Sequence, residues 1–218
     1  MKSKKTILSV AIALLLICAI GGTVAWLTAD DGTVKNTFTE SDIDITLTET
    51  KPVDKSAQMV PGWTIDKDPK VTVDADSEDC WLFVKITEST SPDLDTYIAY
   101  AIASGWESVQ EEDANGVTVI GRKVYKGEGA SGFGILGAGT YTDDAGTITW
   151  ADNQVGVKPS VNETKMTEIS TTNPTFKPTL TFDAYAVQLF KTNSNNDKDN
   201  TADEFTKAEA WDKAKNLI

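Results

Sequence analysis

Along most of the chain the apolar side chains recur at every second position, which is the pattern of half-buried β-strands. Residues 42–48 show it most clearly. In this run Ile43, Ile45 and Leu47 all fall on one face. Residues 81–86, by contrast, are apolar on nearly both faces, so we expect a buried strand in the middle of a sheet. Further strands are predicted at residues 71–73, 117–120, 123–125, 147–150 and 179–187, the last being the longest.

Two stretches have the helical period of 3.6 residues instead. The first covers residues 93–103 and follows Ser91 and Pro92, which suit the cap and the first position of a helix. Its apolar face comprises Leu94, Ile98, Ala101 and Ile102. The second covers residues 202–216, with Thr201 as its cap. Its apolar stripe, which we expect to dock on the core, comprises Phe205, Ala208, Trp211 and Ala214.

The order of these elements predicts an all-β fold. Turn residues separate the short strands, as at Asp144-Ala145-Gly146, and we expect a hairpin closed around Gly121-Arg122. The strand–helix–strand alternation that a parallel sheet requires is missing from the pattern. We therefore predict that residues 41–218 form an antiparallel β-sandwich with two short helices.

The N-terminus has the three-part layout of a secretory signal peptide, predicted over residues 1–25. Lysines at positions 2, 4 and 5 precede an apolar run over residues 6–20, and the pair Gly21-Gly22 breaks that run. Thr23 and Ala25 then form a small-x-small cleavage pattern, so Trp26 would be the first residue of the exported protein. The expected localisation is secreted or at the cell surface.

Two other interpretations of this segment stay open. The uncharged run continues to Ala29 and is long enough to remain as a membrane anchor, although Gly21-Gly22 and the small residues favour cleavage. Cys18 could instead carry a lipid, but Leu16-Ile17 stand before it where small residues are expected. Cleavage would leave Cys80 as the single cysteine, and its strand-like surroundings predict a buried, inert thiol.

Composition excludes several classes of function. The chain has no histidine, so no Ser-His-Asp triad and no HExxH zinc site can form. The net charge is −13, and removal of residues 1–25 with their three lysines makes it more negative still. Such a protein repels phosphate backbones, so we expect no nucleic-acid partner. No cofactor is expected, and the protein is not predicted to be an enzyme.

Three segments imitate known sites. Residues 127–137 match GxGxxG, but strand-like sequence follows where a dinucleotide loop needs a helix, so a β-connection is the better interpretation. Residues 193–204 place oxygen-bearing side chains at calcium-loop positions, but Lys198 stands where the turn requires glycine, which favours a surface loop. The acidic runs at residues 111–113 and 143–144 could pair as catalytic carboxylates, or simply be solvated loops.

Several segments in sequence order resemble one family, the TasA/camelysin group of exported Gram-positive proteins with SipW-type signal peptides. The segments are residues 21–27, 36–38, 43–49, 60–62, 67–69, 80–86 and 184–188. The resemblance implies a jelly-roll arrangement of the sandwich and a place in extracellular biofilm-matrix fibres. The implied partners are further copies of the chain or related matrix proteins, and a signal peptidase during export.

In such fibres the segment after the cleavage site leaves its own subunit and adds as a strand to the next. Here that segment would be residues 26–40, and its β-prone side chains are Trp26, Leu27, Val34 and Phe38. Asp30-Asp31-Gly32 interrupts it. Camelysin-type proteins have been labelled metalloproteases, and the missing histidine gives that label no support in this chain.

Two alternatives come from other functional classes. The protein could be a monomeric adhesin or binding module at the cell surface, for which an exposed aromatic such as Trp106 would serve, although we expect Trp106 to pack beneath the first helix. A secreted, metalloprotease-like protein of unknown type ranks last.

Overall fold

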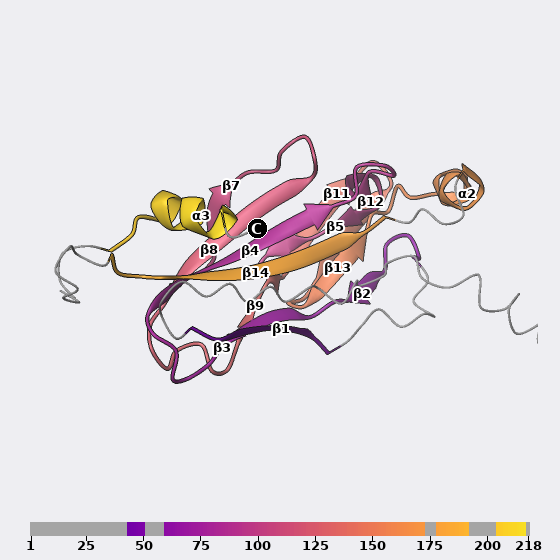
Figure 1. The fold of residues 1–218 in the computed structure, drawn as a ribbon. Coiled ribbons are helices and arrows are strands. Elements are labelled where there is room, and N and C mark those ends of the chain that lie inside the picture. Colours follow the sequence, from indigo (N-terminus) through magenta and orange to yellow (C-terminus); the bar gives the residue numbers. More distant parts are fainter. Residues whose placement is uncertain (1–42, 51–58, 173–177, 192–203, 217–218) are drawn as a thin grey trace, which may run out of the picture.

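The computed structural model describes residues 43–50, 59–172, 178–191 and 204–216 of the 218-residue chain, with residues 168–172 described by their backbone alone. These residues form an all-β fold of antiparallel sheets with two short helices (Figure 1), as the alternating pattern predicts. The jelly-roll arrangement of these strands stays a prediction. Within the described residues no helix has the length and hydropathy needed to cross a membrane.

The largest sheet has four strands in the order β14-β4-β8-β7. Their bounds are Leu180–Gln188 for β14, Cys80–Glu88 for β4, Val117–Val124 for β8 and Glu107–Gln110 for β7. Strand β4 pairs with both neighbours from Cys80 to Thr87. The prediction of a central strand at residues 81–86 is therefore confirmed, and the apolar run on both faces is explained by cover on both sides.

Smaller sheets face this one across the core. One has the order β1-β3-β9 and another β2-β13-β5, and two further pairs are β10-β6 and β11-β12. The bounds in chain order are Ile45–Glu49 (β1), Thr64–Asp66 (β2), Pro69–Val73 (β3), Ile98–Ala99 (β5), Ala101–Ile102 (β6), Phe133–Gly134 (β9), Leu136–Gly137 (β10), Gly139–Asp143 (β11), Gly146–Trp150 (β12) and Gln154–Val157 (β13).

The main core lies between these layers. Strand β4 contributes Leu82, Val84 and Ile86 to it, and the facing strands contribute residues such as Val71 and Val155. Ile43 and Ile45 are buried in the same core, with Leu47 packed against it, so the face predicted for residues 42–48 is confirmed. Burial of these apolar side chains is the main stabilising contribution to such a fold.

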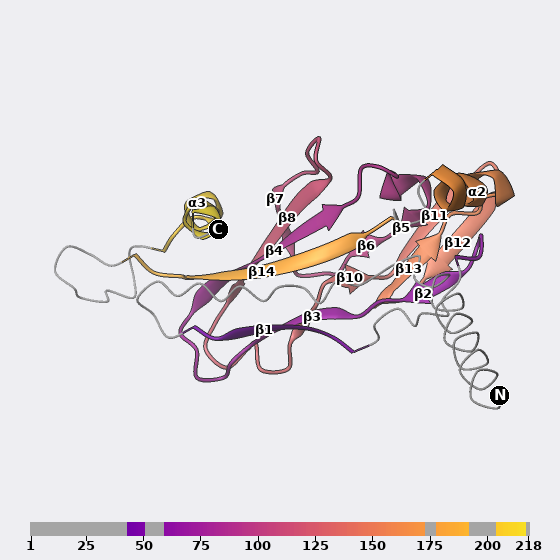
Figure 2. The ribbon, with the colours of Figure 1, turned by 45° about the vertical axis from the view of Figure 1, so that its right-hand side comes forward.

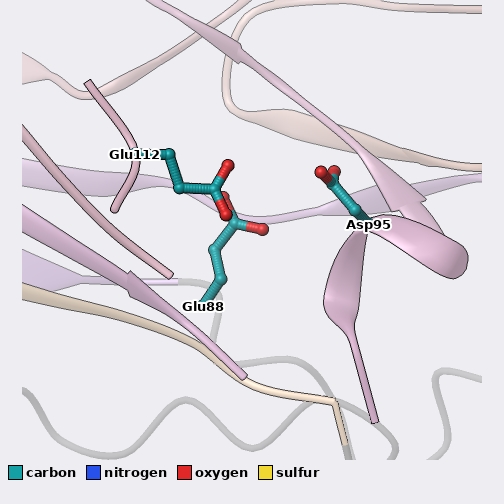
Figure 3. Close-up of side chains that lie close together, drawn as sticks. All are labelled: Glu88, Asp95 and Glu112. Atoms are coloured by element: carbon teal, nitrogen blue, oxygen red, sulfur yellow. The ribbon is translucent and has the colours of Figure 1, made fainter. Parts of the chain in front are cut away.

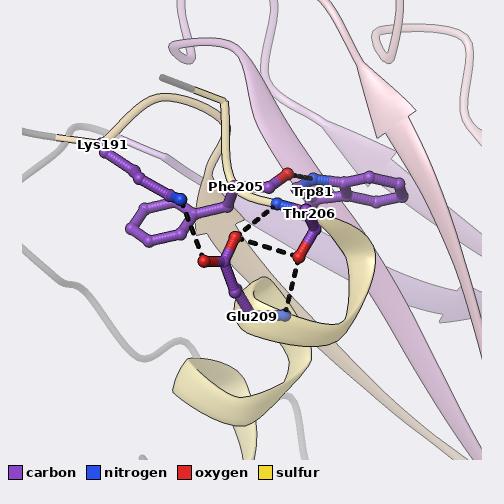
Figure 4. Close-up of polar contacts among 5 residues, drawn as sticks. All are labelled: Trp81, Lys191, Phe205, Thr206 and Glu209. Carbon is purple, nitrogen blue, oxygen red and sulfur yellow. Dashed lines mark hydrogen bonds and ion pairs between the residues drawn. The ribbon is translucent and has the colours of Figure 1, made fainter.

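A second, smaller core lies on the opposite face of the four-stranded sheet. It contains Trp81, Phe83 and Tyr185, and the C-terminal helix α3 (Lys207–Lys215) covers it with Ala210 and Ala214. The indole N–H of Trp81 donates to the carbonyl oxygen of Phe205 at 2.8 Å, which ties the start of the helix to β4 (Figure 4). The predicted docking of this helix is therefore confirmed.

Helix α3 begins later than predicted. Thr206 is its cap, since the Thr206 hydroxyl accepts from the backbone N–H of Glu209 and the Glu209 carboxylate accepts from the backbone N–H of Thr206, a reciprocal capping box (Figure 4). The Lys191 ammonium adds an ion pair to Glu209 at 2.9 Å. Phe205 precedes the helix, and Ala208 of the predicted stripe is exposed.

The helix predicted at residues 93–103 is wrong. Only a 3-10 turn, η1 (Leu94–Thr96), forms there, capped by the Asp93 side chain, and the Ser91-Pro92 peptide bond is cis. The following residues enter strands β5 and β6, which pair with β13 and β10. Short apolar runs fit a strand as well as a helix, and here pairing with β13 and β10 favours the strand.

The hairpin predicted around Gly121-Arg122 is also wrong. Strand β8 runs straight through both residues and pairs with β4 on one side and β7 on the other. Gly121 is there because of a close contact, since a Cβ atom on it would lie 2.8 Å from the ring of Phe83. In this strand the glycine allows close packing, whereas the sequence pattern predicted a turn.

Two smaller predictions can be settled, and one helix was not predicted. The turn at Asp144-Ala145-Gly146 joins β11 to β12 as expected. Cys80 is fully buried, as predicted, and burial raises the pKa of its thiol to about 12, which agrees with an inert cysteine. Helix α2 (Glu163–Thr172) was not predicted, because its sequence carries few apolar side chains. Its one local signal is Asn162, whose side-chain oxygen accepts from the backbone N–H of Lys165.

Candidate functional site

Three carboxylates from separate segments meet at one end of the four-stranded sheet (Figure 3). Glu88 is the last residue of β4, Asp95 lies in η1 and Glu112 lies between β7 and β8. One carboxylate oxygen from each residue lies within 4.8 Å of one carboxylate oxygen from each of the other two. Glu88 is buried, whereas Asp95 and Glu112 are exposed. We call these three residues the acidic cluster.

The loops on either side of Glu88 are held by backbone contacts. The backbone N–H of Glu88 donates to the carbonyl oxygen of Gly116 at 2.8 Å, which fixes the loop that carries Glu112. Gly116 has a φ of 71°, and a Cβ atom there would lie 2.6 Å from the carbonyl oxygen of Glu88, so this position requires glycine. After Glu88, the backbone N–H of Leu94 donates to the carbonyl oxygen of Ser89, and this bond holds η1 and Asp95 in place.

The cluster favours a bound proton near neutral pH. Burial, and to a smaller extent the negative charges of Asp95, Glu112 and Asp93, raise the pKa of Glu88 to about 7, although a 2.5 Å hydrogen bond from the Tyr100 hydroxyl opposes the rise. Burial and the neighbouring carboxylates also raise the pKa of Glu112.

Lys158 is in contact with Asp95. Its ammonium nitrogen is 3.9 Å from the Asp95 carboxylate, and it also donates to the carbonyl oxygen of Asp95. This cation offsets part of the negative charge of Asp95. The cluster therefore carries an excess of negative charge when all three carboxylates are ionised.

Chemically, the acidic cluster can exchange a proton near pH 7, and its carboxylate oxygens are ligands of the kind that hard cations such as Ca²⁺ prefer. Among the described residues these are the ones whose positions would allow a shared cation. A nucleophile–histidine pair is excluded by the sequence, which contains no histidine. The arrangement thus supports proton or cation exchange.

A second feature is the pair of edge strands β1 and β14. Each lies at the edge of its own sheet, and the two edges run side by side (Figures 1 and 2). Over the described ranges, no strand pairs with the outer side of either one. We call this pair the open edges.

The ladder of β14 fixes which backbone groups point outward. The backbone N–H of Ser89 donates to the carbonyl oxygen of Thr179, and the backbone N–H of Leu189 donates to the carbonyl oxygen of Asp79. It follows from the register that the odd-numbered residues of β14 exchange backbone hydrogen bonds with β4. The N–H and C=O groups of the even-numbered residues, such as Phe182, Ala184 and Ala186, consequently point away from β4. The side chains of these same residues face the main core.

A buried ion pair links the two open edges. Lys67 is fully buried, and its ammonium group donates to both carboxylate oxygens of Glu49 on β1, at 3.0 and 3.1 Å. The same ammonium lies 5.4 Å from the ring centroid of Phe182 on β14. Burial raises the pKa of Glu49 despite the opposing effect of Lys67.

The residues predicted for cleavage and assembly, Thr23, Ala25, Trp26, Leu27, Val34 and Phe38, lie outside the described residues, as does the calcium-like loop up to residue 203. Glu204, the last position of that loop, forms an ion pair with Lys123. These predictions are untested by the structure.

The acidic runs behave differently from one another. Asp143 caps its turn by accepting from the backbone N–H groups of Ala145 and Gly146, and Glu111 accepts from the Ser108 hydroxyl. Of the predicted acidic residues only Glu112 joins a cluster. Its partners Glu88 and Asp95 were missed, because a lone glutamate at a strand end carries no sequence signal. The glycine-rich residues 127–137 form the expected β-connection, with β9 and β10 inside it.

No protein-family model matches this chain, and neither the curated proteins nor the solved structures contain a match.

Proposed function

We propose that the protein is an exported structural protein that assembles into extracellular fibres by donating residues 26–40 to the next copy. The observation that carries the proposal is the pair of open edges. A sheet edge with outward backbone groups is a template for a further strand, and most proteins block such edges unless they use them. The resemblance to TasA/camelysin proteins and the predicted export segment agree with this function.

The chemistry of the open edges suits a donated strand. Such a strand would pair with the outward backbone groups of Phe182, Ala184 and Ala186 on β14. Because the side chains of these residues face the core, alternate apolar side chains of the donor would extend that core. Val34 and Phe38 are separated by an even number of positions, so both fall on one face of an extended donor.

A surface binding module is the second candidate, and a specific observation favours it. Trp63 is 66% exposed at the start of β2, where Gly62 with a φ of 74° directs the chain into the strand. An exposed tryptophan is a common anchor residue in binding sites. Trp106 is partly buried against the main core and therefore suits this role less well.

Negative-stain electron microscopy tests the proposed function. We expect the chain starting at Trp26 to form fibres, and the same chain lacking residues 26–40 to remain monomeric. Monomers from both chains, in concentrated and in acidified solution alike, would exclude self-assembly and leave the binding module as the better candidate.

A matched pair of edge variants separates strand donation from other contacts. Ala186→Pro removes an outward N–H group from β14 without removing a hydrogen bond to β4, and proline is tolerated on edge strands. Ala186→Ser keeps the N–H group and serves as the control. We expect the proline variant alone to lose fibres while both variants keep the circular dichroism of the parent chain.

A further inference from the structure

Arg122 is the only arginine of the chain, and it has an unusual environment. The protein contains 33 acidic residues, and lysines such as Lys67, Lys85 and Lys123 form ion pairs with them. In the part of the chain that the structure describes, neither an ion pair nor a hydrogen bond joins the Arg122 guanidinium to another residue, and its Nε atom is buried without a partner. In so acidic a protein, a lone arginine without a carboxylate requires an explanation.

Aromatic rings hold the guanidinium in place. Its Cζ atom lies 3.6 Å from the ring centroid of Phe133 on β9 and 5.5 Å from that of Trp106. The two rings are tied together, because the indole N–H of Trp106 donates at 2.8 Å to the carbonyl oxygen of Gly134, next to Phe133. A ring stacked on the face of a guanidinium leaves the in-plane N–H donors free to bind a ligand.

The terminal nitrogens of Arg122 lie beside a glycine. A Cβ atom on Gly105 would be 3.4 Å from Nη1 and 3.7 Å from Nη2, and Gly105 is exposed with a φ of 88°. Gly105 thus has no side chain that could cover the two terminal nitrogens of Arg122. Arg122 itself is half-buried, which leaves its terminal N–H groups within reach of solvent.

The carboxylate near Arg122 belongs to Glu128. Burial lowers the pKa of Arg122, and Glu128 opposes this effect. The Glu128 carboxylate nevertheless accepts from the backbone N–H of Tyr125 at 3.2 Å and forms no ion pair with Arg122. Folding therefore buries the Nε atom without giving the guanidinium a partner within the described structure, and its solvent-accessible terminal N–H groups can still bind an anion in the plane of the guanidinium.

We propose that Arg122, held by Phe133 and Trp106 and bordered by Gly105, binds a carboxylate. The planar fork matches two carboxylate oxygens, and a singly charged group is repelled less by the acidic protein than a phosphate dianion is. The carboxylate belongs to a small molecule or to an acidic side chain of a second copy. This site is independent of the open edges and does not require fibre formation.

Nuclear magnetic resonance tests the site directly, because one arginine gives one Nε–Hε signal. The 15N-labelled protein is titrated with sodium acetate and, at equal ionic strength, with sodium chloride. We expect a saturable shift of this signal and of the Trp106 indole signal with acetate alone. Equal, unsaturated drifts with both salts, together with no dependence on protein concentration, would overturn the proposal, as would tighter binding of inorganic phosphate.

Variants and dilution complete the test. Arg122→Lys keeps the charge without the fork, so acetate affinity read from the Trp106 signal should fall by at least about tenfold. Glu128→Gln, the matched control, should keep or strengthen binding. If the Nε–Hε signal also moves with protein concentration and acetate reverses that movement, the carboxylate is supplied by a second copy. An Arg122→Lys variant that binds acetate as tightly as the parent would refute the site.

Discussion

At the scale of single residues, charges buried in an otherwise apolar fold give the sharpest expectations. The pKa of Glu88 is about 7 in the folded protein, above its ordinary value of 4.5. Between these two values the folded protein therefore holds a proton that the unfolded chain has lost. It follows that the Glu88 contribution to the free energy of unfolding is present below about pH 4.5 and is lost as the pH rises through 7.

Glu88→Gln removes this titration while keeping an oxygen that can accept from Tyr100. We expect its free energy of unfolding to match the parent protein at pH 4.5 and to exceed it by about 1–2 kcal/mol at pH 8. Urea unfolding followed by tryptophan fluorescence across this range measures the difference, with the exposed Glu111→Gln as control. Parallel pH profiles for Glu88→Gln and the parent would contradict the raised pKa.

The buried pair of Lys67 and Glu49 supplies a second expectation. Lys67→Met leaves the Glu49 carboxylate without its cation, and we expect a loss of about 2–4 kcal/mol in the free energy of unfolding at pH 7. Adding Glu49→Gln should restore part of that loss, because the second change removes the unpaired charge. Strictly additive effects in this double-mutant cycle would argue against the pair.

A matched comparison comes from the Lys85–Asp183 pair, which has a similar distance of 2.9 Å but is about a quarter exposed on both partners. Solvent screens such a pair, so Lys85→Met should change the free energy of unfolding by less than about 1 kcal/mol. The contrast between the two lysines would show that burial sets the energetic importance of each pair.

At the scale of elements, helix α3 depends on its first turn. Thr206→Ala removes the hydroxyl that accepts from the backbone N–H of Glu209, which should cost about 1 kcal/mol of stability. Thr206→Ser keeps that oxygen and should cost much less. Thermal unfolding measures both, and equal melting temperatures for the alanine variant and the parent would show that the capping box does not stabilise the helix.

The sequence predicts the strands better than the turns and helices. Residues 81–86 and 179–187 were recognisable because an apolar run and an alternating run reflect the two sides of a sheet directly. Residues 93–103 were not, because their apolar positions fit a helix and two short strands equally well and distant partners made the choice. Gly121 was read as a turn, although its role is to let the ring of Phe83 approach.

The candidate sites were less predictable for a related reason. Glu112 belongs to an acidic run in the sequence, but its nearness to Glu88 and Asp95 depends on the meeting of a strand end, a 3-10 turn and a loop, which no local pattern encodes. Arg122 showed nothing in the sequence beyond being the single arginine, and its significance came from the rings placed around it by other strands. Clusters built from distant segments become visible only when the fold is known.

At the scale of the whole molecule, the layered sheets produce two neighbouring edges with outward backbone groups, and the chain carries a β-prone segment with a predicted export signal before it. Both features are accounted for if residues 26–40 of one copy pair as a strand with the open edges of the next copy. In that case affinity between copies would come from backbone hydrogen bonds and from the burial of alternate side chains, so it would survive high salt.

The most direct test of this account is a calorimetric titration of a synthetic peptide comprising residues 26–40 into the protein that lacks them. We predict saturable one-to-one binding that persists in high salt and is lost in the Ala186→Pro variant but kept in Ala186→Ser. Absence of binding to a deletion protein that circular dichroism shows to be folded would contradict strand donation as the basis of assembly.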